Sequence, residues 1–233
     1  GLADKKNELA KINKTIEKAE IKMLGVEVSP NYKRVFEDDL TKCGRFYGGA
    51  FQTMKSEYRD SILINGEFTN ELDFKTCHPR ILASMHDVIL DPKHDFYAIP
   101  ELLKKGLTRD FIKSLIFPIL VCDSRANAIK AIANKIKSFK MHSSIVEEII
   151  DEFEKHNHML VPYFYNKNLY QDLQNKDSTI AEIILLYFAT QDIPVLPYHD
   201  SFRIQDKYME ELAQIMLSAW TEVLGYPENC IIN

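Results

Sequence analysis

The sequence has no apolar run that approaches the roughly 20 residues of a membrane-spanning helix. Its N-terminus is polar and lysine-rich, without the apolar segment of a signal peptide. Cysteine is scarce, and its four residues are scattered without any CxxC pair: Cys43, Cys77, Cys122 and Cys230. Internal repeats and low-complexity segments are also missing. These absences predict a cytoplasmic protein with reduced thiols and no membrane partner, and they argue against a zinc site.

Positive charge is not in excess either. The formal net charge is −5, which by itself argues weakly against nucleic-acid binding. The distribution is uneven, however, because residues 101–140 carry only three acids. The nine basic residues of this stretch are Lys104, Lys105, Arg109, Lys113, Arg125, Lys130, Lys135, Lys137 and Lys140. A solvated helix face explains most such runs, and a phosphate-binding surface is the sharper alternative.

What is present fits an ordinary folded chain. With 233 residues, 45% hydrophobic and 27% charged, the chain has room for one domain or two small ones. It begins at Gly1 without a methionine, which is typical of a tagged chain or of a piece of a longer protein. Helical spacing of apolar residues predicts helices at 3–24, 32–54, 81–89, 108–120, 123–139, 143–156, 179–191 and 206–224. Helices covering one antiparallel sheet give an α+β fold.

Two strand-like stretches end in a lone acid. Residues 193–202 form a short apolar run that reaches Asp200, and a hairpin predicted at 61–74, with an Asn-Gly turn, carries Asp73. If these strands are neighbours in one sheet, the two carboxylates meet. Two divalent ions roughly 3.5–4 Å apart, bridged by carboxylates, are what phosphoryl-transfer chemistry uses. The plainer alternative is that Asp200 caps a turn and Asp73 pairs with a surface lysine.

A glycine-rich stretch follows the first predicted loop. Paired glycines at 48–49 let another backbone or a phosphate come close, and Arg45 stands beside Tyr47 and other aromatics. Phosphate binding or base stacking by Arg45 is one interpretation. A bend in the helix predicted over 32–54 is the other.

These segments resemble the palm and fingers of family A DNA polymerases and of their relatives, the phage-type single-subunit RNA polymerases. The first motif of that family runs here from Asp73-Phe74 through Pro79-Arg80. The second, a helix with Arg, Lys and Phe at four-residue spacing, matches Arg109, Lys113 and Phe117. The third is His199-Asp200. The helix before it in DNA polymerases is similar to the stretch with Gln174, and Gly44-Arg45-Phe46-Tyr47 is similar to a Gly-Arg-x-Tyr signature of the RNA polymerases.

The resemblance implies a template-directed nucleotidyltransferase that works in replication or primer synthesis. Asp73, Asp200 and the Phe74 carbonyl would hold two Mg²⁺ (or Mn²⁺) ions. Arg109 and Lys113 would bind the triphosphate of an NTP or dNTP, and Phe117 would pack against the nucleotide. The other implied residues support the site or contact nucleic acid: Arg45, Tyr47, Arg80, Gln174 and His199. A catalytically inactive polymerase-like module that binds nucleic acid or a replication partner is the alternative.

One departure from the family concerns sugar selection. Family A DNA polymerases place Glu where this chain has His78, and Tyr-Gly where it has Val121-Cys122. In the family these two side chains close off the 2′ position of the sugar. We therefore expect an enzyme that accepts ribonucleotides, as a primase-polymerase does.

The resemblance also implies a division of the chain. Residues 1–60 would be an N-terminal helical segment, 61–100 the first part of the palm, 101–172 helical fingers, and 173–233 the second part of the palm. The chain has no room for an exonuclease domain or a long thumb. We expect low processivity on a single-stranded or primed template, with a partner subunit or further region that supplies grip.

Overall fold

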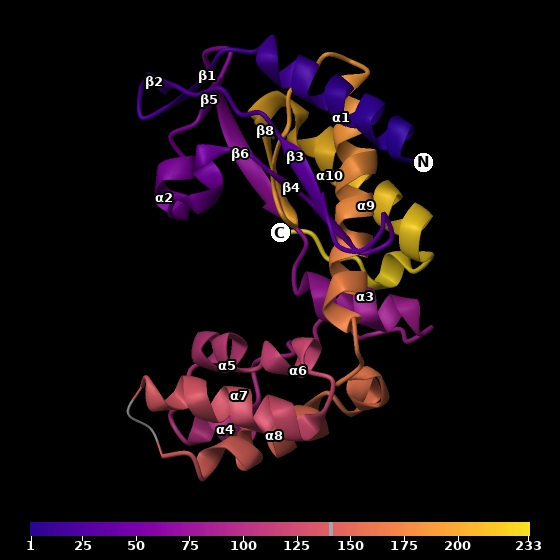
Figure 1. The fold of residues 1–233 in the computed structure, drawn as a ribbon. Helices are drawn as coiled ribbons and strands as arrows, with labels where there is room; N and C mark the ends of the chain where they lie inside the picture. Colours follow the sequence, from indigo (N-terminus) through magenta and orange to yellow (C-terminus); the bar gives the residue numbers. More distant parts are fainter. Residues whose placement is uncertain (140–141) are drawn as a thin grey trace.

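A six-stranded antiparallel sheet organises one half of the molecule (Figure 1). The computed structural model describes residues 1–139 and 142–233. The strands follow the order β2-β1-β5-β6-β8-β7. Their bounds are β1 Ile21–Met23, β2 Val26–Glu27, β5 Leu63–Ile64, β6 Glu67–Asp73, β7 Leu196–Tyr198 and β8 Ser201–Gln205. The pair β6 and β8 joins segments from distant parts of the chain, with Asp73 opposite Ser201.

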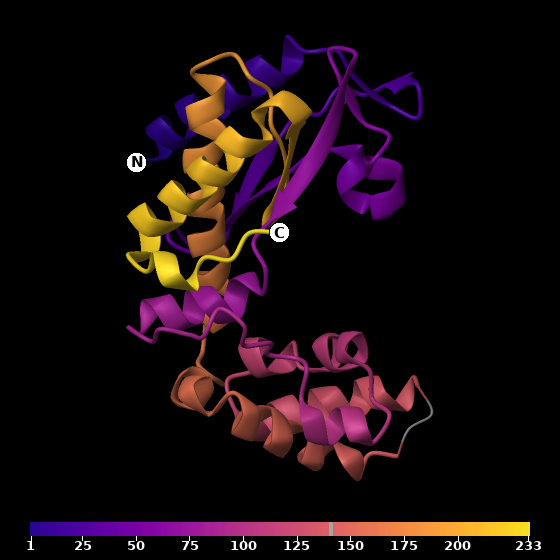
Figure 2. The same ribbon diagram turned by 180° about the vertical axis from the view of Figure 1, so that it is seen from behind.

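Three helices pack along one face of this sheet: α1 Leu2–Glu17, α9 Leu169–Ala189 and α10 Met209–Leu224 (Figure 2). On α10 the buried residues Leu212, Met216 and Trp220 recur every fourth residue, so they form one apolar stripe. This stripe meets buried Phe202 and Ile204 of β8 to form the core. The expected α+β architecture, an antiparallel sheet covered by helices, is confirmed.

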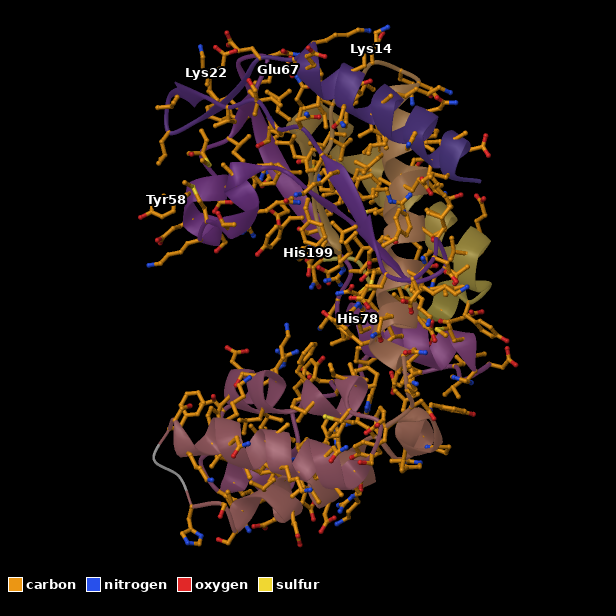
Figure 3. The ribbon with its side chains drawn as sticks, viewed as in Figure 1. Lys14, Lys22, Tyr58, Glu67, His78 and His199 are labelled. Carbon is orange, nitrogen blue, oxygen red and sulfur yellow. The ribbon has the colours of Figure 1, made fainter. Side chains whose placement is uncertain are left out.

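Residues 91–163 form a second, helical half, and the rest of the chain is the sheet half (Figure 1). The helical half contains α4 Pro100–Lys104, α5 Arg109–Leu115, α6 Pro118–Val121, α7 Arg125–Lys137 and α8 Ile145–His156. The chain leaves the sheet half after α3, Cys77–Met85, and returns through the 3₁₀ turn His158–Tyr163 into α9. His78 and His199 lie on the side of the sheet half that faces the helical half (Figure 3). No helix in the described residues is both long and apolar enough to cross a membrane.

The helix predicted over 32–54 is wrong. The chain forms a hairpin there, β3 Lys33–Phe36 with β4 Cys43–Tyr47, followed by the short helix α2, Ser56–Arg59. Glycine decides the difference, because Gly48 has a φ of +144° and a Cβ there would lie 2.0 Å from the carbonyl oxygen of Asn31. Gly48 therefore admits another stretch of backbone, as the sequence suggested, but directly after a strand rather than in a bent helix.

The bounds of other helices and strands also differ from the prediction. The first helix ends at Glu17, and the chain then enters β1 and β2, so the segment 1–60 is not purely helical. The stretch 193–202 contains a turn rather than one strand, and this turn carries His199 and Asp200. Helix α9 begins ten residues earlier than predicted. The helix over 108–120 divides at Pro118, as expected of a residue that lacks an N–H.

A buried ion pair ties the β3–β4 hairpin to the helices. Arg34 on β3 binds Glu182 on α9, and their side chains are only 4% and 6% exposed. Lys5 on α1 adds a second contact to the same carboxylate. The Arg34 Nε–H also donates to the carbonyl of Gly44 at 2.7 Å. One carboxylate thus joins three elements of the sheet half.

We predict that Glu182→Ala lowers the free energy of unfolding by about 3 kcal/mol, because it leaves the Arg34 charge buried without a partner. Urea denaturation measures the change. The matched control is Lys18→Ala, which removes the exposed pair Lys18–Asp192 just after the C-terminal end of α9 and should cost less than about 1 kcal/mol. Equal effects of the two substitutions would contradict the role of burial.

Candidate nucleotide and metal site

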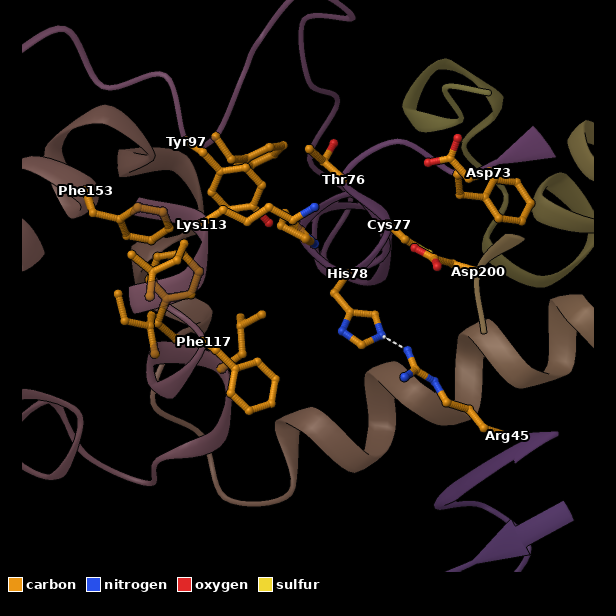
Figure 4. Close-up of a pocket in the computed structure, with 17 residues that line it drawn as sticks. Arg45, Asp73, Thr76, Cys77, His78, Tyr97, Lys113, Phe117, Phe153 and Asp200 are labelled. Atoms are coloured by element: carbon orange, nitrogen blue, oxygen red, sulfur yellow. Dashed lines mark hydrogen bonds between the residues drawn. The ribbon is translucent and has the colours of Figure 1, made fainter. Parts of the chain in front are cut away.

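Asp73 and Asp200 lie close together at the same end of β6 and β8 (Figure 4). Asp73 ends β6, Asp200 stands in the turn before β8, and the Phe74 N–H donates to the Asp200 carbonyl at 3.1 Å. On the other side of Asp73, its N–H and carbonyl bond the backbone of Asn233 at 3.3 and 3.0 Å. Neither carboxylate forms an ion pair with the residues that the structure describes. The alternative in which Asp73 pairs with a surface lysine therefore gains no support.

Burial disfavours the charge of both acids. It raises the pKa of Asp200, and the carboxylate of Asp177 adds to this effect. It also raises the pKa of Asp73, where the nearby charge of Glu71 acts in the same direction and Lys113 opposes it. Two neighbouring carboxylates without a cation partner are costly to keep charged. A bound divalent cation would remove that cost.

A pocket of about 240 Å³ opens beside the two acids, between the sheet half and the helical half. Its polar wall comes from the sheet half and includes Arg45, His78 and both aspartates. Its opposite wall comes from the helical half, with Lys113 and Phe117 facing across (Figure 4). The remaining lining residues are largely apolar, which limits the water that can enter.

Helix α5 supplies two cations to this region. Lys113 lines the pocket, and Arg109 lines an adjoining cavity together with Asp73 and Lys113. The Arg109 Nε–H donates to Asp95 at 2.7 Å. This contact and the charge of Asp95 raise the pKa of Arg109 against the opposing effect of burial. The four-residue spacing seen in the sequence thus places both side chains on the face of α5 that looks toward Asp73.

Part of the positive charge of residues 101–140 is paired within the protein. Several of these basic residues are neutralised by acids of the helical half, which the count within the run did not include. Lys105 binds Glu148 and Arg125 binds Glu154. Lys140 lies outside the described residues. Lys113 forms no ion pair within the part of the chain that the structure describes. Its positive charge is therefore available to a ligand in the pocket.

A buried aspartate that the sequence analysis missed holds the polar wall together. Asp177 on α9, with a side chain 2% exposed, accepts hydrogen bonds from Arg45 at 3.1 and 3.2 Å and contacts His78 Nε2 at 2.7 Å. Burial lowers the pKa of Arg45, but the hydrogen bonds and charge of Asp177 outweigh it, and the net direction is upward. Gln174, which we had expected here, is buried one turn earlier on α9 and does not line the pocket. Helical register was the available signal, since Tyr170 and Asp177 share one face of α9.

Aromatic side chains flank this wall. His199 has a φ of +58° in the turn, and its ring packs against Tyr47 at 5.7 Å and Tyr198 at 5.1 Å between centroids. Burial, followed by the charge of Arg45, lowers the pKa of His199. Phe117, 46% exposed, packs edge-on against Tyr170 at 5.0 Å. The expected residues Tyr47, His199 and Phe117 therefore gather around one region, although Tyr47 and His199 do not line the pocket itself.

Arg80 does not reach the pocket. It is 1% exposed, and its guanidinium donates to Thr76 Oγ1 at 3.0 Å and to the carbonyls of Pro92 and His94 at 3.3 Å. These bonds hold the loop after α3 and support Thr76, whose φ of +49° is unusual for a β-branched residue. The structure thus gives Arg80 a scaffold position behind the site rather than a contact surface for a primer.

The donors present fit a magnesium ion. Carboxylate and carbonyl oxygens are the ligands that Mg²⁺ prefers, and it commonly uses one or two carboxylates and keeps several waters. No group of three or more His, Cys, Asp or Glu that could hold a metal occurs among the described residues. A metal held by Asp73, Asp200 and the Phe74 carbonyl would therefore have coordination positions that the protein does not fill. Water or oxygens of a bound substrate would complete them.

The comparisons with known proteins agree with this fold. The chain is similar to the POL domain of Pol1 from M. smegmatis in complex with DNA primer-template and dNTP, with a TM-score of 0.50 and 11% sequence identity. The match covers 96% of this chain and 49% of that one, so the chain spans about half its length. No protein-family model matches the sequence. No curated protein matches it either. The chain therefore has a polymerase-like fold.

We predict that Asp200→Asn is more stable than the wild type at neutral pH, by about 1 kcal/mol, because it removes an unpaired charge from a buried position. The folded-state pKa of Asp200 is raised above its ordinary 3.8, so the cost of ionisation appears as pH rises through the raised pKa. The gain should therefore shrink as pH falls toward 3.8. Thermal unfolding across this range tests it.

The control for this experiment is Asp110→Asn, because the Asp110 side chain is 92% exposed and its 3.6 Å ion pair with Arg109 is screened by solvent. It should leave the unfolding temperature unchanged at every pH. A gain from Asp200→Asn that does not depend on pH would contradict the electrostatic explanation.

Proposed function

We propose that this protein is a template-directed nucleotidyltransferase, a family A-like DNA polymerase that acts in replication or primer synthesis. The observation that carries the proposal is the pair Asp73 and Asp200, which meet at the same end of β6 and β8 and face Lys113 across a pocket in a polymerase-like fold. The substrates of this class would be a nucleoside triphosphate and a primed or single-stranded template.

Asp73, Asp200 and the Phe74 carbonyl would hold Mg²⁺ or Mn²⁺ in this proposal. When bound, the metal would lower the pKa of the attacking hydroxyl and neutralise charge on the phosphates. The protein contributes fixed geometry. Backbone bonds from Phe74 to Asp200, and between Asp73 and Asn233, hold both acids on one rigid sheet edge.

The helical half would hold the other end of the substrate. Lys113 and Arg109 would bind the triphosphate, where fixed cations stabilise charge that develops on the leaving group. The exposed face of Phe117 would pack against the base. The apolar walls of the pocket would exclude water, which strengthens these electrostatic contacts.

Arg45, held by Asp177, would face the primer end, with Tyr47 and His199 supporting the turn that carries Asp200. The chain covers 49% of the similar polymerase domain. We propose that a partner subunit or a further region supplies the remaining grip on the template. The cytoplasmic location indicated by the scattered cysteines stays a prediction.

Primer extension tests the proposal directly. We predict that the wild type with Mg²⁺ extends a primed template, that Asp200→Asn loses more than about 10³-fold in rate, and that Lys113→Ala loses about 10²–10³-fold. Lys130→Ala is the control, because it removes an equally charged but exposed lysine from α7 and should change the rate less than twofold. An equal signal from wild type and Asp200→Asn would remove the catalytic role and favour an inactive nucleic-acid-binding module.

We further propose that the enzyme accepts ribonucleotides. His78 lines the pocket, and its Nε2 lies 2.7 Å from the Asp177 carboxylate and 3.0 Å from the Arg45 Nη2. In the tautomer that donates from Nε2 to Asp177, Nδ1 is a hydrogen-bond acceptor, and it points toward the side of Phe117 (Figure 4). An acceptor there suits a sugar that has a 2′-hydroxyl. Val121, 45% exposed on α6, follows the pocket residue Leu120 without lining the pocket itself, and it carries no bulky ring that could close off the sugar.

We predict that the wild type uses ribonucleotides within about tenfold of the efficiency for deoxynucleotides, and that Val121→Tyr lowers ribonucleotide use at least about tenfold through steric exclusion. Steady-state incorporation of each nucleotide pool measures both. Val121→Leu adds bulk without a ring and should keep the wild-type ratio. An active enzyme that incorporates only deoxynucleotides at high ribonucleotide concentration would refute the idea.

A further inference from the structure

The loop of residues 91–99 connects the sheet half to the cations of α5. Arg80 holds its first part through the carbonyls of Pro92 and His94. The loop then presents Asp95 to Arg109, and Tyr97 to the candidate site. Neither residue belongs to a motif that the sequence analysis singled out.

Asp95 is held in one orientation from two sides. Its Oδ1 accepts the N–H groups of Tyr97 at 3.0 Å and Ala98 at 3.3 Å, while Oδ2 accepts from Arg109. Burial alone would raise the pKa of Asp95, but the hydrogen bond from Arg109 and these backbone N–H groups lower it. The carboxylate is therefore charged at neutral pH, and it fixes the loop and Arg109 relative to each other.

Tyr97 lies beneath both cations. The Arg109 Cζ is 5.3 Å from its ring centroid, and the Lys113 Nζ is 5.8 Å from it. Both distances fall within the roughly 6 Å range of cation–π attraction. The ring is 7% exposed, and burial raises the pKa of Tyr97 to about 12, so the phenol stays uncharged. The aromatic face, rather than a phenolate, attracts the two side chains.

We propose that Tyr97 is a positioning residue for the triphosphate: its ring holds Lys113 and Arg109 in the direction of Asp73 before a substrate enters. The inference rests on the proposed function, because it assigns a triphosphate to these cations. A lysine has four rotatable bonds, and ordering it on binding costs affinity. A ring that orders the ammonium in advance reduces that cost without touching the substrate.

Calorimetric binding of inorganic tripolyphosphate with Mg²⁺, and separately of ATP, tests the proposal without requiring turnover. Tyr97→Leu should weaken both about three- to tenfold, the loss of two cation–π contacts. Tyr97→Phe keeps the ring and should bind like the wild type. Affinity for a primed template, which does not depend on this ring, should remain unchanged in both variants.

A second substitution separates cation attraction from packing. Pentafluorophenylalanine in place of Tyr97 keeps the shape of the ring but reverses its quadrupole, so it should weaken tripolyphosphate binding as Leu does while the unfolding temperature stays close to that of Tyr97→Phe. Equal binding by the fluorinated and Phe variants would overturn the proposal, and so would wild-type binding by Tyr97→Leu.

Failure of the proposed function would look different. If the wild type binds tripolyphosphate and Tyr97→Leu loses it, yet no primer is extended, the positioning role of Tyr97 stands and the polymerase activity falls. If the wild type binds neither probe, both are overturned.

Discussion

The pairing of β6 with β8 is the contact on which the site depends. Side chains alternate between the two faces of a strand, so a slip of one residue would turn Asp73 away from the pocket. Arg203, 3% exposed on β8, secures the register: its Nη1–H donates to the Thr69 carbonyl at 3.1 Å, and its Nη2–H donates to Glu71 at 3.2 Å. The hydrogen bonds of Arg203 therefore fix the register of β6 against β8.

Opposite charges face each other across the pocket. The sheet half presents two carboxylates that burial disfavours, and the helical half presents Lys113 and Arg109. A ligand with phosphates at one end and divalent cations at the other would neutralise both walls at once. This division explains why the site spans the two halves, since the carboxylates without an ion pair lie on one wall and Lys113 lies on the other. Tyr97 and Asp95 belong to the helical half, but Arg80 on α3 holds their loop by a hydrogen bond to the Pro92 carbonyl. The same loop holds Arg109 through Asp95, so hydrogen bonds and ion pairs connect the two walls of the pocket.

Much of the site was predictable because its signals are local. A short apolar run that ends in an acid, an Asn-Gly turn and a four-residue spacing of basic side chains each occupy fewer than a dozen positions. For Asp177 the only local signal was the helical face that it shares with Tyr170, and this does not identify a partner, because Arg45 folds against Asp177 from another element. The hairpin at 33–47 was missed for a related reason. Its strands are four and five residues long, and their conformation depends on Gly48 meeting the Asn31 backbone, a tertiary contact.

The helical half is inserted into the sheet half, since the chain leaves after α3 and returns in α9. Its contacts are mostly between neighbours in sequence, whereas β6 and β8 are more than a hundred residues apart. Closing so long a loop costs more chain entropy than forming nearby helices, and distant pairings form late. We therefore expect the inserted helices to organise first and to shorten the distance between the strands. In that order of events the two aspartates come together only at the end of folding, and the pocket is absent from partly folded chains.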